Sequence, residues 1–473
     1  MVVSVHIGSD HFAAQVYDDV KRRGFLRFNY STLTMKHTYI LFLIMLANIS
    51  FGQEVMTLER ALAIGLENNF GIKIADKAIA VAVNNNTWAR AGKTPTIDLN
   101  GSFNNSLIND NNPASFLQGT YYIGSLAATV DANWVLYNGG RIKLNKEQLN
   151  LAVDQQKLNK SSDINALFRL IYQQYYDVIF QQEQLEVLNQ VLALSRDRLD
   201  YETARKEFGS SNAYNLIQFE SSVIADSNAI INQEQRVEIA KRTLSNTLDI
   251  ENYNDYIIDE RLSINPEPID EEKLKRLLSE ENYTLKSLEM IAALNRLNTG
   301  IAKAARKPTI SVSGSIGFAE NAFKFFADNP NTGEPFEFQL ANRITGGLNA
   351  FLNYNLVDGG VRRDNIQSAE LQEEIDQLTI LEAQVELNNQ LDILIDNYEN
   401  QLDLLALTDR QIQLSQSNLD ITEQRFRSGQ LTSLDYRNVQ NQYLNAAYSK
   451  VGAIYSLLIT KSEIDFLVGV FGE

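Results

Sequence analysis

The chain has 473 residues, a formal net charge of −17 at pH 7 and no cysteine. Its three histidines are all near the N-terminus, at positions 6, 11 and 37, so residues 53–473 contain neither His nor Cys. That part of the chain therefore cannot build thiol nucleophiles, Ser-His-Asp triads, His-ligated zinc sites or disulfides. The acidic balance repels phosphate backbones, so we expect no nucleic-acid partner. We predict no catalytic residue, metal or cofactor.

Residues 35–52 have the pattern of a secretory signal peptide. A basic residue follows Met35, an apolar run covers residues 39–47, and small residues occupy the −3 and −1 positions of a cleavage site after Gly52. The apolar run is far shorter than the roughly 20 residues that a membrane-spanning helix needs. We therefore predict export, with translation starting at Met35 and residues 1–34 forming a non-native or untranslated extension.

Prolines leave two long windows free for helix, between Pro113 and Pro266 and after Pro335. In both windows, apolar residues recur three, four and seven positions apart. In the first window they are Leu144, Leu151, Leu158, Ile171, Tyr175, Val178, Leu185, Leu188, Leu192 and Leu199, and in the second Leu371, Ile375, Leu378, Val385, Leu391, Leu394, Tyr398, Leu405, Ile412 and Leu419. Such narrow stripes predict helices packed as coiled coils. A single helix over 142–208 would span about 100 Å.

Four other segments alternate apolar and polar residues with a period of two. They cover about 96–107, 122–137, 309–319 and 343–357. Each has about the length of a strand that spans a membrane, with one apolar and one polar face. Alternation alone fits a half-buried soluble sheet equally well.

The chain is a tandem duplication. The sequence Asn138-Gly139-Gly140 corresponds to Asp358-Gly359-Gly360, 220 residues later, and residues 205–209 correspond to 425–429 at the same offset. Equal offsets predict helices of equal length in both halves. Pro95 corresponds to Pro308 at an offset of 213. We place the first repeat at 53–265 and the second at 266–473.

Each joint of the repeat has a physical role. Pro95 and Pro308 are the predicted helix-to-strand joints, because the residue before proline avoids helical dihedrals. The two Asn/Asp-Gly-Gly motifs are the strand-to-helix joints, where the polar side chain caps the helix and the glycines adopt positive φ. Gly209 and Gly429 reverse the chain between antiparallel helices.

With these motifs in this order, the chain resembles the TolC-type outer-membrane factors, the outer membrane efflux protein family. The resemblance covers about 58–466 and rests most on residues 133–140, residues 353–360, and residues 423–429 with Leu434 and Asp435. It implies a mainly α fold with β, TolC-like, in which a homotrimer builds a 12-stranded transmembrane β-barrel that continues into a long periplasmic α-helical barrel. Four strands cannot close alone, and open edges in lipid leave backbone groups unsatisfied.

The same resemblance implies an outer-membrane channel of a tripartite efflux or type I secretion system, extending into the periplasm. Such a channel passively conducts substrates from a periplasmic adaptor (membrane fusion protein) and an inner-membrane transporter to the exterior. The chain has no Gly-x-x-x-x-Gly-Lys-Ser/Thr phosphate loop, so energy would come from the transporter. Outer-membrane lipid surrounds the barrel in this reading.

By resemblance, the helix turns form a periplasmic tip where the adaptor docks. The tip residues are Gly209, Ser210, Ser211, Asn212, Arg425, Gly429, Gln430, Leu431 and Thr432, and Phe208 replaces the small residue of the second copy. In the family, acidic residues after the second turn ring a closed aperture. Asp435 takes that place here, with Asn438 and Asn215 at two further positions, so the ring has fewer acids than the full pattern. Asp435 fits equally a residue that stabilises a helix N-terminus.

Two connecting segments complete the expectation. Residues 319–341 form a strand-to-strand loop rich in Phe, which fits either the membrane interface or a loop folded over the barrel mouth. Residues 249–270 link the repeats and, by resemblance, form an equatorial belt.

Two other classes of protein remain as alternatives. One is a periplasmic coiled-coil scaffold or adaptor with a small β domain. The other is a carboxylate-based hydrolase using pairs such as Glu373 with Glu374 or Asp403 with Asp409, although such residues on helices usually form a solvated face.

Overall fold

The two proline-free windows form two long helical hairpins in the computed structural model, which describes residues 54–114, 118–252, 256–265, 268–328 and 332–470. The long helices are α5 (Arg141–Glu207) and α9 (Val361–Arg427), each of 67 residues, and each is followed by a 36-residue helix, α6 (Ala213–Leu248) or α10 (Ser433–Val468). The equal lengths confirm the duplication. The predicted signal peptide and the extension before it lie outside the described residues.

Shorter elements precede each hairpin. They are β1 (Glu54–Val55), α3 (Leu58–Asn68) and α4 (Phe70–Asn85) in the first repeat, and β4 (Tyr256–Ile257), α7 (Glu271–Glu281) and α8 (Tyr283–Ala304) in the second. No helix within the described ranges combines the length and the apolar character that a membrane crossing requires. Residues 55–473 form one structural unit, and the arrangement described below is that of this unit.

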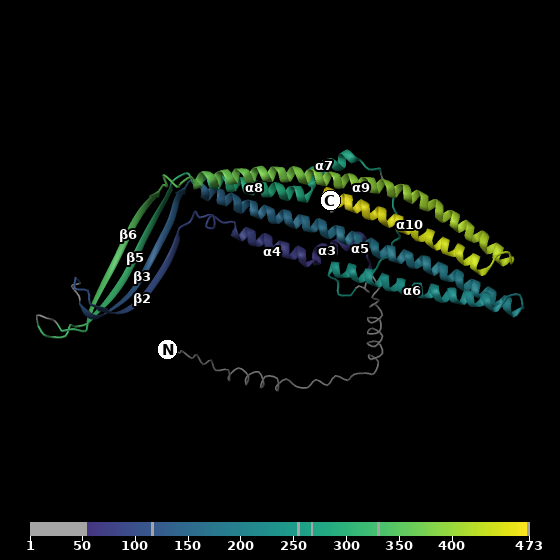
Figure 1. The fold of residues 1–473 in the computed structure, drawn as a ribbon, viewed down its shortest axis with the longest axis horizontal. Helices are drawn as coiled ribbons and strands as arrows, with labels where there is room; N and C mark the ends of the chain where they lie inside the picture. The colour runs from purple at the N-terminus through teal and green to yellow at the C-terminus, as the bar shows by residue number, and fades with distance from the viewer. Residues whose placement is uncertain (1–53, 115–117, 253–255, 266–267, 329–331, 471–473) are drawn as a thin grey trace, which may run out of the picture. The chain divides into compact units, whose positions relative to one another are not determined.

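Four antiparallel strands form one sheet in the order β2-β3-β5-β6 (Figure 1). Their bounds are β2 (Thr96–Asp110), β3 (Gly119–Asn138), β5 (Thr309–Phe325) and β6 (Gln339–Asn353). The prediction for the second hairpin was wrong at its ends: β5 continues to Phe325, and β6 ends at Asn353. Phe323 and Phe325 therefore belong to a strand, because the ladder between Phe323 and Gln339 extends the pairing beyond the apolar stretch.

The helices pack side by side in a defined order. α5 lies between α6 and α10, and α10 in turn packs against α9. Nearer the sheet, α4 packs on α5, α5 on α8, and α8 on α9. In the described chain, α9 is therefore one edge of the helical layer, and α4 and α6 are the other. Figure 1 shows α9, α10, α5 and α6 running alongside one another.

The buried core lies along the seams between helices instead of in one central mass. One cluster joins α3, α5 and the end of α6, and it includes Ala61, Ile171 and Leu248. A second joins α7, α9 and α10, and it includes Leu278 and Leu391. These clusters pack the segments that the sequence places in a belt against the middle of each long hairpin.

Candidate functional site

The strand register gathers the apolar side chains on one face of the sheet. Reading across the strands, Leu99 pairs with Val130, Val130 with Ile316, and Ile316 with Gly346. Other apolar residues of this face, all of them solvent-exposed, are Ile97, Phe103, Leu126, Trp134, Phe318, Ile344, Leu348 and Leu352. A continuous exposed apolar face of this kind is what a strand layer presents to lipid.

The opposite face is polar. Asp98 lies directly opposite Asp131 in the register, and Asp131 lies opposite Ser315. Asn100 donates a hydrogen bond to the carboxylate of Asp131 at 2.9 Å. The alternation predicted from the sequence therefore separates one lipid-compatible face from one water-compatible face.

Aromatic residues gather at the end of the sheet away from the helices. The Tyr121 ring lies 5.2 Å from that of Phe325, and Phe325 lies 5.4 Å from Phe336. Phe325 has the parity of Ser315, so it belongs to the polar face of β5. This placement favours the expectation that the loop covers the open end of the sheet over the expectation that Phe325 meets lipid.

The strand-to-helix joints form as the motifs predict. Gly139 and Gly140 have φ of 74° and 95°, and Gly359 and Gly360 have 68° and 97°. The side chain of Asn138 accepts a hydrogen bond from the backbone N–H of Ile142 at 3.1 Å.

In the second joint Asp358 binds the helix start more extensively. Its carboxylate accepts from the backbone N–H of Arg362 at 3.1 Å and from the Arg362 Nε at 2.6 Å. The hydrogen bonds and charge of Arg362 hold the pKa of Asp358 below its usual value. The joint thus remains charged and capped over the ordinary pH range.

The proline joints differ between the repeats. Pro308 follows the end of α8 at Ala304 and precedes β5, as predicted. Pro95 also precedes a strand, but α4 has already ended at Asn85, and a turn closed by Gly92 lies between them. The prediction that Pro95 stops the helix was therefore wrong.

At the first helical turn, Gly209 has φ 71° and reverses the chain between α5 and α6. The backbone N–H of Ser210 donates to the carbonyl of Arg205 at 2.8 Å, and Ser211 donates to the buried carboxylate of Glu202. Asn212 caps α6 by accepting from the N–H of Asn215 at 2.9 Å. Next to this turn, Phe208 is 84% exposed.

The second turn repeats this geometry with one difference. Gly429 has φ 78°, and Gln430 donates its backbone N–H to the carbonyl of Arg425 at 2.9 Å. Thr432 caps α10, and Asp435 completes a capping box by accepting from the Thr432 N–H at 3.1 Å. Leu431 packs against the aromatic side chains behind the turn.

The structure assigns Asp435 a structural partner at the position predicted for the aperture. The side-chain and backbone hydrogen bonds from Thr432 lower the pKa of Asp435, whose side chain is fully exposed. Of the other two aperture candidates, Asn438 is exposed and Asn215 is half-buried. The Ser433 hydroxyl donates to Asn215 Oδ1 at 3.3 Å, so the two turns contact each other.

Four aromatic rings lock the two hairpins together behind the turns. Phe426 lies 5.5 Å from Phe219, 5.5 Å from Tyr436 and 6.2 Å from Tyr201. These residues come from all four long helices. The two turns are therefore held in a fixed relation by buried aromatic packing.

Buried charged residues near the turns are functional candidates that the sequence reasoning missed. Arg198 is completely buried and forms ion pairs with Asp197 at 3.0 Å and Glu423 at 2.5 Å. Burial alone would raise the pKa of Glu423, but hydrogen bonding and charge from Arg198 outweigh it and lower that pKa. The available signal was a charged residue on a helix face otherwise occupied by Leu and Val.

A second missed feature is an asparagine joint that repeats. Asn69, between α3 and α4, accepts from the Ile72 N–H and donates to the carbonyl of Thr247 at 3.5 Å. Asn282, between α7 and α8, accepts from the Leu285 N–H and donates to the carbonyl of Leu467 at 2.7 Å. Each asparagine ties the belt to the last turn of α6 or α10.

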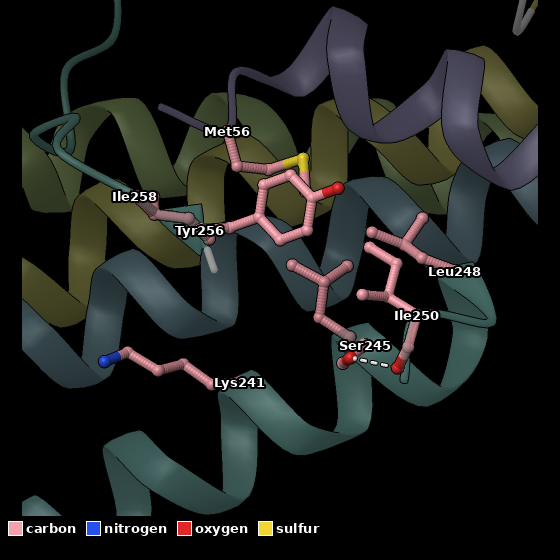
Figure 2. Close-up of a pocket in the computed structure, with 8 residues that line it drawn as sticks. Met56, Lys241, Ser245, Leu248, Ile250, Tyr256 and Ile258 are labelled. Atoms are coloured by element: carbon pink, nitrogen blue, oxygen red, sulfur yellow. Dashed lines mark hydrogen bonds between the residues drawn. The ribbon is translucent and has the colours of Figure 1, made fainter. Parts of the chain in front are cut away.

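The belt holds a small apolar pocket at the end of α6 (Figure 2). It is lined by Met56, Lys241, Leu244, Ser245, Leu248, Ile250, Tyr256 and Ile258. Figure 2 shows the Ser245 hydroxyl directed at the Ile250 carbonyl, a hydrogen bond of 2.9 Å, and Lys241 extending away from the apolar side chains. The pocket brings no pair of carboxylates together, and its Lys241 pairs with Glu238 at 3.5 Å.

The carboxylate pairs considered for catalysis do not form a site. Glu374 and Asp403 are exposed on α9, and Asp409 pairs with Lys450 at 2.8 Å. Among the described residues, no group of three or more His, Cys, Asp or Glu side chains is arranged to hold a metal ion.

Comparison with known proteins agrees with this geometry. The outer membrane efflux protein family model matches residues 62–248 and 276–470, one segment in each repeat. A comparison with curated protein sequences finds no match.

Several solved outer-membrane proteins share the fold at low sequence identity. VceC from Vibrio cholerae superposes with a TM-score of 0.69 at 14% identity, covering 87% of this chain and 96% of that one. The CmeC channel of Campylobacter jejuni gives 0.69 at 14% identity over 95% and 94% of the two chains. The MtrE channel of Neisseria gonorrhoeae, in its open state, gives 0.66 at 15% identity over 87% and 89%. With its TolC-like fold, its two repeats and a family match over most of its length, the chain belongs to the outer membrane efflux protein family and is an outer-membrane efflux channel that extends into the periplasm.

Proposed function

We propose that three copies of this chain form a passive duct in which 12 strands close a barrel through the outer membrane and the long helices continue it through the periplasm. The observation that carries the proposal is the sheet of four strands with an exposed apolar face. In the described chain, β2 and β6 each pair with a neighbour on one side only. An open edge in lipid costs several kcal/mol for each unsatisfied backbone group, so strand pairing must continue onto other copies.

The polar face of the sheet then lines the interior. Serine, asparagine, threonine and aspartate dominate it, which favours water and polar or amphiphilic cargo over a sealed core. Every joint analysed above has a capping or packing role, and none supplies a nucleophile or a general base. We infer that transport through this duct involves no chemical step in the chain.

The helical turns are the proposed docking site for a periplasmic adaptor, which connects the duct to an inner-membrane transporter. Support comes from the side chains exposed there: Phe208, Tyr214 and Leu434 surround the two turns. Exposed aromatic residues beside a rigid turn are typical anchors of protein interfaces. Asp435, Asn438 and Asn215 remain the proposed aperture residues.

Fractionation followed by bilayer recording tests the proposed function. We expect heat-modifiable trimers in the outer-membrane fraction, and discrete conductance steps when purified trimers are added to a planar lipid bilayer. As a control, the same preparation boiled before addition should give no steps. Release of the protein by osmotic shock, or trimers without conductance, would overturn the duct in favour of a periplasmic scaffold.

A further inference from the structure

Two edges of the helical layer expose apolar stripes in the single chain. On α6 the exposed residues are Ile217, Ile224, Ile231 and Ile239, and on the second half of α9 they include Ile393, Leu404, Leu407 and Leu414. Their exposed fractions lie between 48% and 66%. Spacings of three, seven, eight and eleven residues place each set on one side of its helix, as in a coiled-coil seam that lacks its partner.

The chain already contains one example of the corresponding contact. α10 packs antiparallel on α5, and α10 corresponds to α6 while α5 corresponds to α9, both at the offset of 220 residues. The register of the α5–α10 seam is fixed by several contacts. Arg437 donates to the Ser195 hydroxyl at 3.4 Å, and Gln440 donates to the carbonyl of Val191 at 3.0 Å.

The same register continues along the seam. The rings of Phe180 and Tyr455 stack at 4.5 Å, and Arg169 binds Glu463 at 3.1 Å. Further along, Asn165 donates to the carbonyl of Phe466 at 3.2 Å. These contacts run over most of the length of α10, so the seam has one uniform register.

Moving each contact by one repeat gives the register that a seam between α6 and α9 would have. The contact Arg437–Ser195 becomes Ile217 opposite Ser415, the neighbour of Leu414. In the same way Gln440–Val191 becomes Glu220 opposite Gln411. One helical turn from that pair, Ile224 faces Leu407.

The next two contacts give the same result. Phe180–Tyr455 becomes Gln235 opposite Asn400, and one turn away Ile231 faces Leu404. Arg169–Glu463 becomes Thr243 opposite Asn389, and one turn away Ile239 faces Ile393. The transferred register therefore pairs the exposed isoleucines of α6 with the exposed apolar residues of α9.

The intrachain counterpart of one pair is already buried. Leu407 corresponds to Val187, which is buried, and Ile224 corresponds to Leu444, which packs against Leu188. The single chain thus shows that side chains at these positions meet when the seam is complete.

The half of the layer nearer the sheet agrees independently. There α8 packs on α5, with Gln148 donating to Asn298 at 2.6 Å. Moved by one repeat, using 213 for α8 and 220 for α5, this contact becomes Asn85 opposite Ser368. One turn away Val81 lies beside Leu371, and seven residues further Ile74 faces Leu378, all four being exposed in the single chain.

We propose that neighbouring copies join through α9 of one copy and α4 and α6 of the next, in the register that α5 makes with α8 and α10 inside one chain. The pairs are Ile217–Leu414, Ile224–Leu407, Ile231–Leu404 and Ile239–Ile393, with Val81–Leu371 and Ile74–Leu378 nearer the sheet. The occupant of each exposed edge is a second copy of this chain. This inference rests on the proposed trimer and adds its helical interface.

Cysteine cross-linking tests the register, and the absence of native cysteine removes background. The variant Ile224→Cys with Leu407→Cys is oxidised in membranes and run on a non-reducing denaturing gel. We expect covalent dimers and trimers. The matched control, Ile224→Cys with Leu414→Cys, shifts one partner by seven residues, about 10 Å, beyond the roughly 7 Å between Cα atoms that a disulfide spans. It should remain monomeric after denaturation.

A second control separates folding from register. Phe180→Cys with Tyr455→Cys joins the seam inside one chain, so oxidation should leave the mass monomeric while blocking both thiols. If unmodified protein forms outer-membrane trimers but only the Leu414 control cross-links, or neither pair does while the variants still form trimers, the register is overturned and the duct stands. If the unmodified protein is monomeric, the proposed trimer fails and the interface fails with it.

Discussion

Asp226 on α6 and Arg437 on α10 form a two-point salt bridge, with Nη1–Oδ2 at 2.8 Å and Nη2–Oδ1 at 2.5 Å. The carboxylate is almost fully buried, and Ser195 on α5 donates to it at 2.6 Å. The pair therefore ties the two hairpins together next to the helical turns. The repeat counterpart of Arg437 is Ile217, so this tie is specific to the seam inside the chain.

Removing one partner of that bridge should destabilise the helical layer strongly. We expect Arg437→Met to lower the free energy of unfolding by about 3–5 kcal/mol, because it leaves the Asp226 charge buried without its partner. Urea unfolding followed by circular dichroism in detergent measures this. Combining it with Asp226→Leu should recover most of the loss, since neither charge then remains. Equal losses in single and double variants would contradict the coupling.

The Arg198–Glu423 pair predicts a pH dependence. The pKa of Glu423 in the folded state lies below its ordinary value of 4.5. The stabilisation is therefore fully present above about pH 4.5 and is lost as the pH falls through the lower folded-state pKa. We expect Glu423→Gln to flatten this part of the acid limb when the urea midpoint is measured against pH. An unchanged acid limb would show that other carboxylates carry it.

The strand-to-helix joints offer a matched pair of substitutions. A Cβ at Gly139 would lie 2.4 Å from the carbonyl oxygen of Ala304, whereas one at Gly359 would meet nothing within 4 Å. Both glycines have positive φ, so alanine at either costs about 1–3 kcal/mol in strain. We expect Gly139→Ala to lower the thermal midpoint more than Gly359→Ala does. Equal midpoints would mean that α8 moves freely away from the joint.

The two faces of β5 can be tested in neighbouring residues. Ile316 belongs to the apolar face, and Ser315 belongs to the polar face opposite Asp131. An arginine on the lipid side of a membrane strand costs about 2–4 kcal/mol near the bilayer centre. Ile316→Arg should therefore reduce insertion into lipid vesicles, while Ser315→Arg should insert normally and change ion selectivity. The reverse result would assign the faces the other way round.

Asp435 has two proposed roles that one substitution separates. Asp435→Asn keeps an oxygen that accepts from the Thr432 N–H but removes the charge. If the charge rings the aperture, we expect this variant to lose part of its cation selectivity in planar bilayers while its thermal midpoint changes little. Asp435→Ala should affect both. A conductance unchanged in Asp435→Asn and altered only in Asp435→Ala would leave Asp435 with the capping role alone.

Much of the architecture follows from local patterns in the sequence. The absence of proline and the recurring stripes predict long helices, and the offset of 220 residues predicts their equal length. Gly139, Gly209 and their counterparts mark reversals because only glycine adopts positive φ there without strain. Strand ends were less certain: β5 extends to Phe325 because ladder hydrogen bonds continue after the apolar alternation stops.

The sequence by itself determined which segments are helix or strand and where the chain reverses, because those choices depend on neighbours within a few residues. Only the tertiary structure decided that Arg198, Asp226 and Arg437 are buried ties, since each is paired with a residue more than 200 positions away. Only the order of the helices showed which apolar stripes are covered and which remain exposed at an edge. Burial depends on what packs alongside a helix, and two helices with the same pattern differ in this when one has a neighbour on both sides and the other on one side.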